Sequence, residues 1–401
     1  MRKPVKGNML IAQSGGPSMV INQSLAGAVE EARKHSHVRA IYGAMHGIKG
    51  LLERDIINLR KESPASLKTV AKTPSSALGT VRQKPTRQDC MAIFNTLRAY
   101  GVNYFFYIGG NDSAETAHIL SEEAKRSAFE LNCYHIPKTI DNDLLENDHT
   151  PGFGSAAKYV ASAVMGDNLD NRALPGVKID IVMGRHAGFL TASAALARRW
   201  PDDGPHLIYC PERAFDMNAC FRDVNRVYKK YGRCVMAVSE GIADKNGEAI
   251  AKKFLREVDS HGNVQLSGSG ALGDFLAREI KTRTGIKRVR ADTFGYLQRS
   301  FPDVVSRVDA REARQAGVYA VRSTLKKTGG SIVIRRKPVK KYQVYYECIP
   351  LRKVARNTRP MPARFLNRAG NNVTKAFLDY AAPIVGPLPE IGRLKCVKVR
   401  K

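Results

Sequence analysis

The segment Pro137-Lys138-Thr139-Ile140-Asp141-Asn142-Asp143 carries the residue types that acid–base chemistry on a phosphate ester requires. It contains two carboxylates, those of Asp141 and Asp143, which stand two residues apart and close to a lysine and a threonine. An Asp in such a turn can accept a proton from a substrate hydroxyl while a phosphoryl group is transferred. The other Asp could hold a metal or a water, and the lysine could bind phosphate. A solvent-exposed Asx turn is the alternative interpretation.

Two glycine-rich segments are suited to binding an anion. They are Ser14-Gly15-Gly16-Pro17-Ser18 and Gly109-Gly110-Asn111-Asp112-Ser113, and each lies between a predicted strand and a predicted helix. Glycines let backbone N–H groups approach a phosphate, and the following helix points its positive end at it. Asp112 would repel phosphate unless a cation intervenes. The alternatives are a tight turn for the first segment and a helix cap for the second.

Two further segments add basic groups. In Met183-Gly184-Arg185-His186-Ala187-Gly188, the arginine suits a phosphate or a transition-state oxygen. The histidine there is either catalytic or hydrogen-bonded as part of the structure. Arg290 and the segment 293–299, which contains Tyr296 and Arg299, could hold a sugar phosphate, or they could form a solvated basic loop.

Two common nucleotide motifs give no support to a nucleotide site. Residues 268–273 read Gly-Ser-Gly-Ala-Leu-Gly and match GxGxxG, but they follow a polar stretch without a convincing strand. A turn before a helix at 274–281 is therefore the better interpretation. No Gly-Lys pair occurs in the sequence, so a Walker A motif is absent and an ordinary P-loop kinase is excluded.

The elements that must position these residues alternate along the first three hundred residues. Short apolar strands, each followed by a helical stretch, predict an α/β protein with largely parallel sheets. Ligands bind such sheets beyond the carboxyl ends of the strands, where the polar and glycine-rich segments cluster. The helices are expected at 18–34 and from about 185 to 199, and the strands at 9–12, 104–108, 133–136, 179–183 and 234–238.

The C-terminal region has a different character. Strands are expected at 331–334 and 343–349, and a turn and a helix within 361–386. From Lys326 to Lys401 there are nineteen Lys or Arg residues and three acidic ones, which is more than half of the formal net charge of +28. We therefore expect a basic C-terminal extension, residues 326–401, packed on the body of the protein.

The basic excess raises the question of nucleic acid as a partner. The sequence speaks against that function, because Asp141, Asp143 and Glu240 stand at predicted strand ends, where a polyanion site would want cations. The tail also lacks regularly spaced aromatic stacking positions. We expect no specific nucleic-acid binding.

Composition is that of an ordinary globular protein, with 43% apolar and 25% charged residues in 401. The sequence contains no apolar run of about 18 residues, so no membrane-spanning helix is predicted. Seven scattered cysteines without a CxxC motif make a disulfide framework or a zinc site improbable, so we expect a reducing, cytoplasmic setting.

Together, the five strand-end segments resemble the phosphofructokinase family in order and spacing, over about residues 7–325. The resemblance implies two Rossmann-like α/β domains with the active site in the cleft between them. Residues 1–150 would bind the phosphoryl donor and residues 151–325 fructose 6-phosphate, with the chain crossing back near 299. It also implies a homo-oligomer, with a dimer favoured, and Mg²⁺ as cofactor.

The resemblance assigns a role to each matching residue. Asp141 would be the base that takes the proton from the sugar 1-hydroxyl, and Arg185 would stabilise the transferring phosphoryl group. The donor phosphates would contact Gly15, Gly16, Arg82, Asn111, Asp112, Ser113 and Lys138. The sugar phosphate would contact Thr139, Ile140, Asp141, Met183, Gly184, Arg185, Glu240, Arg290, Tyr296 and Arg299. In the family, some basic groups at the sugar end come from a neighbouring subunit, and Arg290 is the best candidate for one.

Departures from the family's ATP-using pattern indicate the donor. ATP users carry GGDGS and PGTIDND where this chain has Asp112 and Lys138. That pair is the pattern of the pyrophosphate-dependent branch, so the resemblance implies a 6-phosphofructokinase that uses pyrophosphate reversibly. At the position where the family usually has a magnesium-binding Asp, this chain has the neutral Asn111. Mg²⁺ would therefore be held by Asp143 or bind mostly through pyrophosphate and water. The alternative is an ATP-dependent 6-phosphofructokinase.

Overall fold

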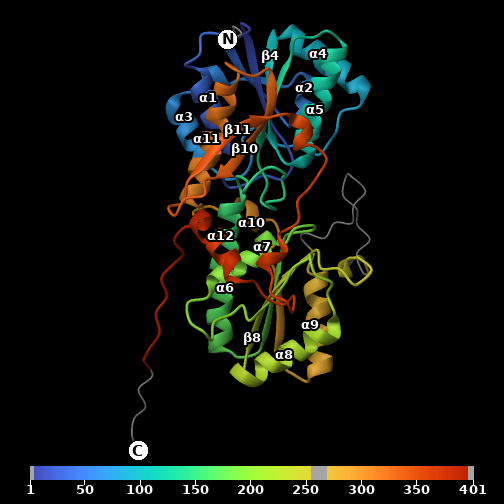
Figure 1. Cartoon of the computed structure of the whole chain (residues 1–401), viewed down its shortest axis with the longest axis vertical. Coiled ribbons are helices and arrows are strands. Elements are labelled where there is room, and N and C mark those ends of the chain that lie inside the picture. The colour runs from blue at the N-terminus through green and yellow to red at the C-terminus, as the bar shows by residue number, and fades with distance from the viewer. Residues whose placement is uncertain (1–3, 254–268, 396–401) are drawn as a thin grey trace, which may run out of the picture.

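The computed structural model describes residues 4–253 and 269–395, and these residues form two sheets, one above the other in Figure 1. Helices pack on both sheets, and the glycine-rich and charged segments singled out in the sequence lie where the two sheets meet. A mixed α/β architecture with largely parallel sheets was predicted, and it is confirmed.

The first sheet has seven strands in the order β11-β10-β5-β4-β1-β2-β3. The five central strands are parallel, while β3 and β11 pair antiparallel at the two edges. The strands are β1 (Gly7–Gln13), β2 (Val38–Ala44), β3 (Ile56–Asn58), β4 (Val102–Gly109), β5 (Asn132–Pro137), β10 (Gly329–Arg336) and β11 (Val344–Ile349).

The central strand β4 shows why this sheet is covered on both faces. Successive side chains of a strand point to opposite faces, and here both sets are apolar. Tyr104 and Phe106 belong to one core, with residues of α1 and α11, whereas Phe105 and Tyr107 belong to another, with residues of α2, α4 and α5. These helices are α1 (Ile21–Ala32), α2 (Ile48–Glu53), α4 (Arg87–Ala99), α5 (Asn111–Arg126) and α11 (Arg307–Ser323), and α3 (Pro64–Lys72) packs on α1.

The second sheet has four parallel strands in the order β7-β8-β6-β9. They are β6 (Val177–Val182), β7 (Leu207–Tyr209), β8 (Cys234–Ser239) and β9 (Val289–Thr293). Helices of this half are α6 (Phe153–Ala173), α7 (Phe189–Ala192), α8 (Met217–Tyr231), α9 (Ala271–Thr284) and α10 (Leu297–Ser300).

The chain passes between the two halves more than once. It leaves the first sheet through α6, returns to it in α11 and β10, and comes back to pack α12 (Lys375–Val385) against α6. Residues 329–349, expected within a C-terminal extension, are therefore strands of the first sheet beside β5. The boundaries proposed for the two domains stay a prediction.

Two predicted elements differ in detail. The helix expected from about 185 to 199 is a short α-helix, α7, that continues as a 3-10 helix over Ser193–Ala197. The helix expected at 274–281 is α9, and it begins at Ala271 after Gly270, while Gly268 of the GxGxxG match lies outside the described residues. The other 3-10 helices are Leu59–Lys61, Ile250–Lys253, Leu351–Lys353 and Ala363–Phe365.

Within the described residues, we find no helix of the length and apolarity needed to span a membrane.

Candidate active site

A pocket of about 790 Å³ lies where the carboxyl ends of the strands of both sheets meet. The segments that line it follow β1, β4 and β5 of the first sheet and β6, β8 and β9 of the second. This is the location that parallel α/β sheets favour for ligands. Two segments without strand neighbours complete the lining, residues 81–84 and the pair Arg356 and Thr358.

The structure brings most of the predicted site residues together in this pocket. Those that line it are Gly15, Gly16, Arg82, Asn111, Asp112, Ser113, Lys138, Thr139, Ile140, Asp141, Asp143, Met183, Arg185, Glu240, Tyr296 and Arg299. His186 also lines the pocket and is exposed there.

Two predicted residues do not line the pocket. Gly184 stands just behind it, with φ of +142°, and a Cβ there would come within 2.7 Å of the carbonyl oxygen of Ala187. Its role is therefore to shape the turn that leads to Arg185. Arg290 is exposed on β9, at the edge of the second sheet, where its guanidinium donates to the carbonyl of Val289.

The glycines after β1 make room for cations. A Cβ on Gly15 would lie 3.5 Å from Lys138 Nζ, and one on Gly16 would lie 2.8 Å from Arg299 Nη1. Lys138 also donates a hydrogen bond to the carbonyl of Gly16. Gly16 thus lets Arg299, from the second half, approach the backbone that Lys138 contacts, while Gly15 is required for its positive φ of +76°.

The start of α5 presents its N–H groups and first-turn side chains to the pocket. Gly110 is the N-cap, and Asn111, Asp112 and Ser113 follow it. The hydroxyl groups of Ser113 and Ser14 are 2.9 Å apart, which ties the loop after β1 to the loop after β4. The positive end of this helix favours an anion bound at that point.

Asn111 and Asp143 form a polar pair at the same end of the pocket. Asn111 Nδ2 donates to Asp143 Oδ2 at 3.1 Å. Asn111 Oδ1 is buried and has no hydrogen-bond partner among the described residues, so this acceptor oxygen is free to bind a cation. A carboxylate and an amide oxygen beside a phosphate site fit Mg²⁺, which keeps several waters and takes few protein ligands. In the part of the chain that is described, no cluster of three metal-binding His, Cys, Asp or Glu side chains occurs.

Burial and charge shift the pKa values of the three ionisable groups in the segment 138–143. Burial lowers the pKa of Lys138 to about 7, and the nearby Arg299 adds to the effect. Burial raises the pKa of Asp141, although Lys138, His186 and the arginines oppose it. Burial and the charge of Asp141 raise the pKa of Asp143 to about 7. Such opposed shifts in one cleft are typical of catalytic groups.

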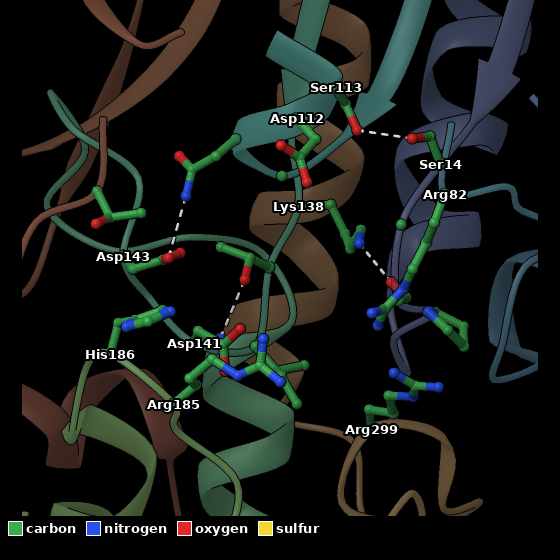
Figure 2. A pocket seen from close by; sticks show the side chains of 18 of the residues that line it. Ser14, Arg82, Asp112, Ser113, Lys138, Asp141, Asp143, Arg185, His186 and Arg299 are labelled. Atoms are coloured by element: carbon green, nitrogen blue, oxygen red, sulfur yellow. Dashed lines mark hydrogen bonds between the residues drawn. The ribbon is translucent and has the colours of Figure 1, made fainter. Parts of the chain in front are cut away.

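Figure 2 shows how the charges are distributed: Arg82, Lys138 and Arg299 lie along one side of the pocket, and Asp141 and Asp143 lie on the other. An anion with several charges would bind along the cationic side. It would favour protonation of Lys138, because a nearby anion stabilises the ammonium form. A hydroxyl-bearing substrate between the two sides would face a carboxylate able to accept its proton.

Sequence reasoning missed Lys84, Glu115 and Arg356. Lys84 lies 2.9 Å from Asp112 and 2.7 Å from Glu115, so it neutralises the mouth of the pocket. Arg356 contacts Glu115 at 3.2 Å from a residue in left-handed conformation, with φ of +74°. Lys84 follows Arg82 closely in LGTVRQKP and could have been noticed there, whereas nothing in the sequence around Arg356 indicates that it reaches the pocket.

Known proteins place this site in context. The model of the family described as phosphofructokinase matches residues 8–324. A pyrophosphate–fructose 6-phosphate 1-phosphotransferase of Rhodospirillum rubrum is 54% identical, over 99% of this chain and 98% of the relative. One with the same name from Xanthomonas campestris is 40% identical, over 94% and 91%. A crystal structure of a pyrophosphate-dependent phosphofructokinase from Nitrosospira multiformis superposes with a TM-score of 0.85 at 30% identity, covering 98% of this chain and 95% of that one.

Proposed function

The chain belongs to the phosphofructokinase family, and we propose that it transfers a phosphoryl group reversibly from inorganic pyrophosphate to the 1-hydroxyl of fructose 6-phosphate. The products are fructose 1,6-bisphosphate and phosphate. The observation that carries this choice of donor is the placement of Asp112 and Lys138 in one pocket, the first at its mouth and the second buried in it. The relatives with pyrophosphate in their names support it.

In the reaction, Asp141 accepts the proton of the sugar 1-hydroxyl. At the same time the oxygen of that hydroxyl attacks the nearer phosphorus of pyrophosphate. A new oxygen–phosphorus bond forms, the bridging bond of pyrophosphate breaks, and inorganic phosphate leaves. Thr139 holds this segment, because its hydroxyl accepts a hydrogen bond from Asp141 N at 3.1 Å. The carboxylate must be ionised to act. Burial raises the pKa of Asp141, and the neighbouring Lys138, His186, Arg299 and Arg82 oppose that rise.

The cations supply most of the transition-state stabilisation. Phosphoryl transfer depends on positioning and charge more than on covalent chemistry by the protein. Arg82 and Lys138 bind the donor phosphates, and Arg185 faces the group in transfer. Because the pKa of Lys138 is lowered to about 7, it takes up its proton when the anionic donor binds.

Magnesium is the proposed cofactor, held by Asn111 and Asp143 together with the donor phosphates and water. When bound, it neutralises part of the phosphate charge. Asn111 Oδ1 and the Asp143 carboxylate are the oxygen ligands that this chain offers.

Sugar binding falls to the second half of the molecule. Glu240, Tyr296 and Arg299 line that side of the pocket, and Met183 lies beside them. Arg290, exposed at the edge strand β9, serves the site of a neighbouring subunit in a homodimer. We assign residues 1–150 to the donor domain and 151–325 to the sugar domain, with the chain crossing back near 299, so that α11 packs on the first sheet. The compartment is the cytoplasm, in keeping with six free cysteines among the described residues.

The test is a coupled assay in both directions. Purified protein with pyrophosphate, fructose 6-phosphate and Mg²⁺ should form fructose 1,6-bisphosphate, detected through aldolase. With fructose 1,6-bisphosphate and phosphate it should form fructose 6-phosphate and pyrophosphate. Turnover in neither direction would remove the proposal.

Lys84→Ala should raise the KM for pyrophosphate about fivefold while changing kcat less. The substitution removes the cation that lies beside Asp112 and Glu115, although Glu115 keeps its contact with Arg356. Lys84 and Asp112 are both largely exposed, so about 1 kcal/mol is the most that the lost pairing should cost. Lys84→Arg is the matched control and should stay near wild type. A KM unchanged in Lys84→Ala would show that this cation has no part in donor binding.

Two opposite changes should move the magnesium requirement in opposite directions. Asp143→Asn removes the proposed anionic ligand and should raise the Mg²⁺ concentration for half-maximal velocity at least about tenfold, because loss of even an outer-shell partner of a metal ligand typically costs that much. Asn111→Asp adds a carboxylate beside it and should lower that concentration. Titration of Mn²⁺ binding by electron paramagnetic resonance should rank the metal affinities of wild type and the two variants in the same order, without turnover. If both variants keep the wild-type requirement, Mg²⁺ is held elsewhere.

A further inference from the structure

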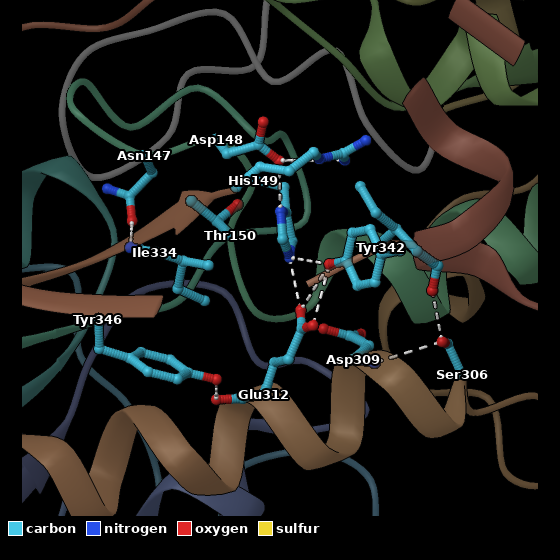
Figure 3. A network of polar contacts seen from close by, with 12 residues as sticks. Asn147, Asp148, His149, Thr150, Ser306, Asp309, Glu312, Ile334, Tyr342 and Tyr346 are labelled. Atoms are coloured by element: carbon cyan, nitrogen blue, oxygen red, sulfur yellow. Dashed lines mark hydrogen bonds and ion pairs between the residues drawn. The ribbon is translucent and has the colours of Figure 1, made fainter. Parts of the chain in front are cut away.

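His149 lies buried between two carboxylates, a short distance along the chain from the catalytic segment. Its side chain is 1% exposed. Nδ1 is 2.8 Å from Asp148 Oδ2, and Nε2 is 2.6 Å from Glu312 Oε2, on α11 (Figure 3). A neutral imidazole can donate from only one nitrogen, and ionised carboxylates only accept. With a carboxylate on each nitrogen, the ring is an imidazolium that donates twice.

The groups around this ring come from several elements. Tyr342 donates its hydroxyl to Glu312 Oε1 at 2.9 Å and lies 3.2 Å from His149 Nε2. Arg336 Nε donates to Asp148 Oδ2 at 3.1 Å. Asp309 also lies on α11, near Glu312. Its carboxylate accepts hydrogen bonds at the start of α6 from Gly152 N, Ser155 N and Ser155 Oγ.

Two negative charges on the ring outweigh the cost of burying it. Burial by itself lowers the pKa of His149, but the hydrogen bonds and charges of Asp148 and Glu312 raise it to about 9. The ring therefore carries its charge at neutral pH and loses it only in alkaline solution. Burial raises the pKa of Asp148, but its hydrogen bond to His149 and the charges of His149, Arg336 and Arg359 bring it below its ordinary value, so the carboxylate is ionised.

The residues on either side of His149 hold Asn142, which stands between Asp141 and Asp143. Thr150 N donates to Asn142 Oδ1 at 3.0 Å, and Thr150 Oγ1 donates to the carbonyl of Thr139 at 2.9 Å.

A second path runs through Asp148. Its carbonyl accepts from Tyr380 Oη and from Arg359 Nη2, both at 2.7 Å, and Asn142 Nδ2 donates to Tyr380 Oη at 2.8 Å. Asn142 is fully buried with φ of +60°, a backbone conformation that needs support from its surroundings.

We propose that His149 is a positioning residue, whose charged ring, clamped by Asp148 and Glu312, fixes the segment that carries Asp141 and Asp143, and whose deprotonation sets an alkaline limit on turnover. The proposal rests on the function proposed above for that segment. Small displacements of a catalytic group far from the mutated site can cost about a hundredfold in rate.

The expected pH dependence has a definite sign. Because the pKa of His149 is raised by folding from 6.5 to about 9, its ion pairs stabilise the native state fully below pH 6.5, and that contribution is lost as the pH rises through 9. Wild-type kcat should therefore fall above pH 9. Asp148→Asn removes one of the two charges, so the fall should begin at least about one pH unit lower.

The experiment measures kcat with pyrophosphate from pH 7 to pH 10. His149→Gln should lower kcat about tenfold at pH 7.5, by misplacing the catalytic segment. It should also abolish the fall near pH 9, because glutamine does not titrate. Glu312→Gln is a second route to the shift expected of Asp148→Asn, should that variant fail to fold. His118→Gln, on α5 outside the pocket lining, is the control and should keep the wild-type profile.

Three results would overturn the proposal: a fall near pH 9 in His149→Gln that matches wild type, no shift in either carboxylate variant, or a wild-type kcat that stays level to pH 10. Thermal unfolding over the same pH range gives a readout without substrate. The stability gap between wild type and His149→Gln should close as the pH rises through 9. If the protein does not turn over pyrophosphate but this stability gap still closes, the proposed function has failed while the account of the buried ion pairs holds.

Discussion

Asp141→Asn is expected to lower kcat with pyrophosphate by about two or more orders of magnitude while leaving the KM for fructose 6-phosphate within about threefold of wild type. Asparagine keeps the size of the side chain and can still form a hydrogen bond with a hydroxyl group, but it lacks the basic carboxylate oxygen. An interaction made mainly in the transition state appears in kcat rather than in KM. Initial rates over a range of sugar concentrations give both constants.

A matched control exists in the same segment of the chain. Glu146→Gln makes the same chemical change at a residue outside the pocket lining, where the carboxylate pairs with Arg335 at 2.6 Å. Its kcat should stay within about twofold of wild type, since a partly exposed ion pair contributes little. A kcat unchanged in Asp141→Asn would mean that another group accepts the proton.

Donor preference should move by up to about a thousandfold when Asp112 and Lys138 are both replaced by glycine. We assume that ATP would bring its α-phosphate to the mouth of the pocket, where the Asp112 carboxylate would repel it. Two unit charges about 4 Å apart repel by about 1 kcal/mol in water and by about 4 kcal/mol at an effective dielectric of 20. These limits correspond to about fivefold and nearly a thousandfold in affinity.

The structure sets where within those limits each single variant should fall. Asp112 is 61% exposed and pairs with Lys84, so water and a cation both weaken its repulsion. Asp112→Gly alone should therefore raise the affinity for ATP by an amount near the lower limit, about fivefold, and should impair the use of pyrophosphate. Lys138 is buried, so Lys138→Gly should damage pyrophosphate turnover much more than it helps ATP. Because both side chains act on one site, the double variant need not be additive.

The donor ratio decides this prediction. kcat/KM for pyrophosphate divided by that for ATP should fall in the order wild type, single variants, double variant. A ratio that Asp112→Gly leaves untouched would show that the carboxylate does not select the donor.

The parts of the site that could be predicted from the sequence are those fixed by local structure. Asp141 and Lys138 follow a buried strand directly, and Asn111 and Asp112 follow another, so the topology of a parallel sheet suffices to bring them together. The alternation of apolar strands and helices is equally local. These patterns predicted the α/β class and most of the strands correctly.

What could not be predicted depends on packing between distant segments. Glu312 meets His149 across 163 positions of sequence, and Arg356 meets Glu115 across 241. Nothing near any of these residues signals its partner. The strands within 329–349 were anticipated, but their place beside β5 was not, because a strand's own sequence does not specify its neighbour.

The measurement that tests the central claim most directly is the donor preference of the unmodified protein. kcat/KM for phosphorylation of fructose 6-phosphate would be determined with Mg²⁺-pyrophosphate and with Mg²⁺-ATP in one preparation, using the aldolase-coupled assay. The buried Lys138, together with the smaller, partly screened repulsion by Asp112, predicts a preference for pyrophosphate of about a hundredfold or more. Equal use of the two donors, or a preference for ATP, would contradict the account.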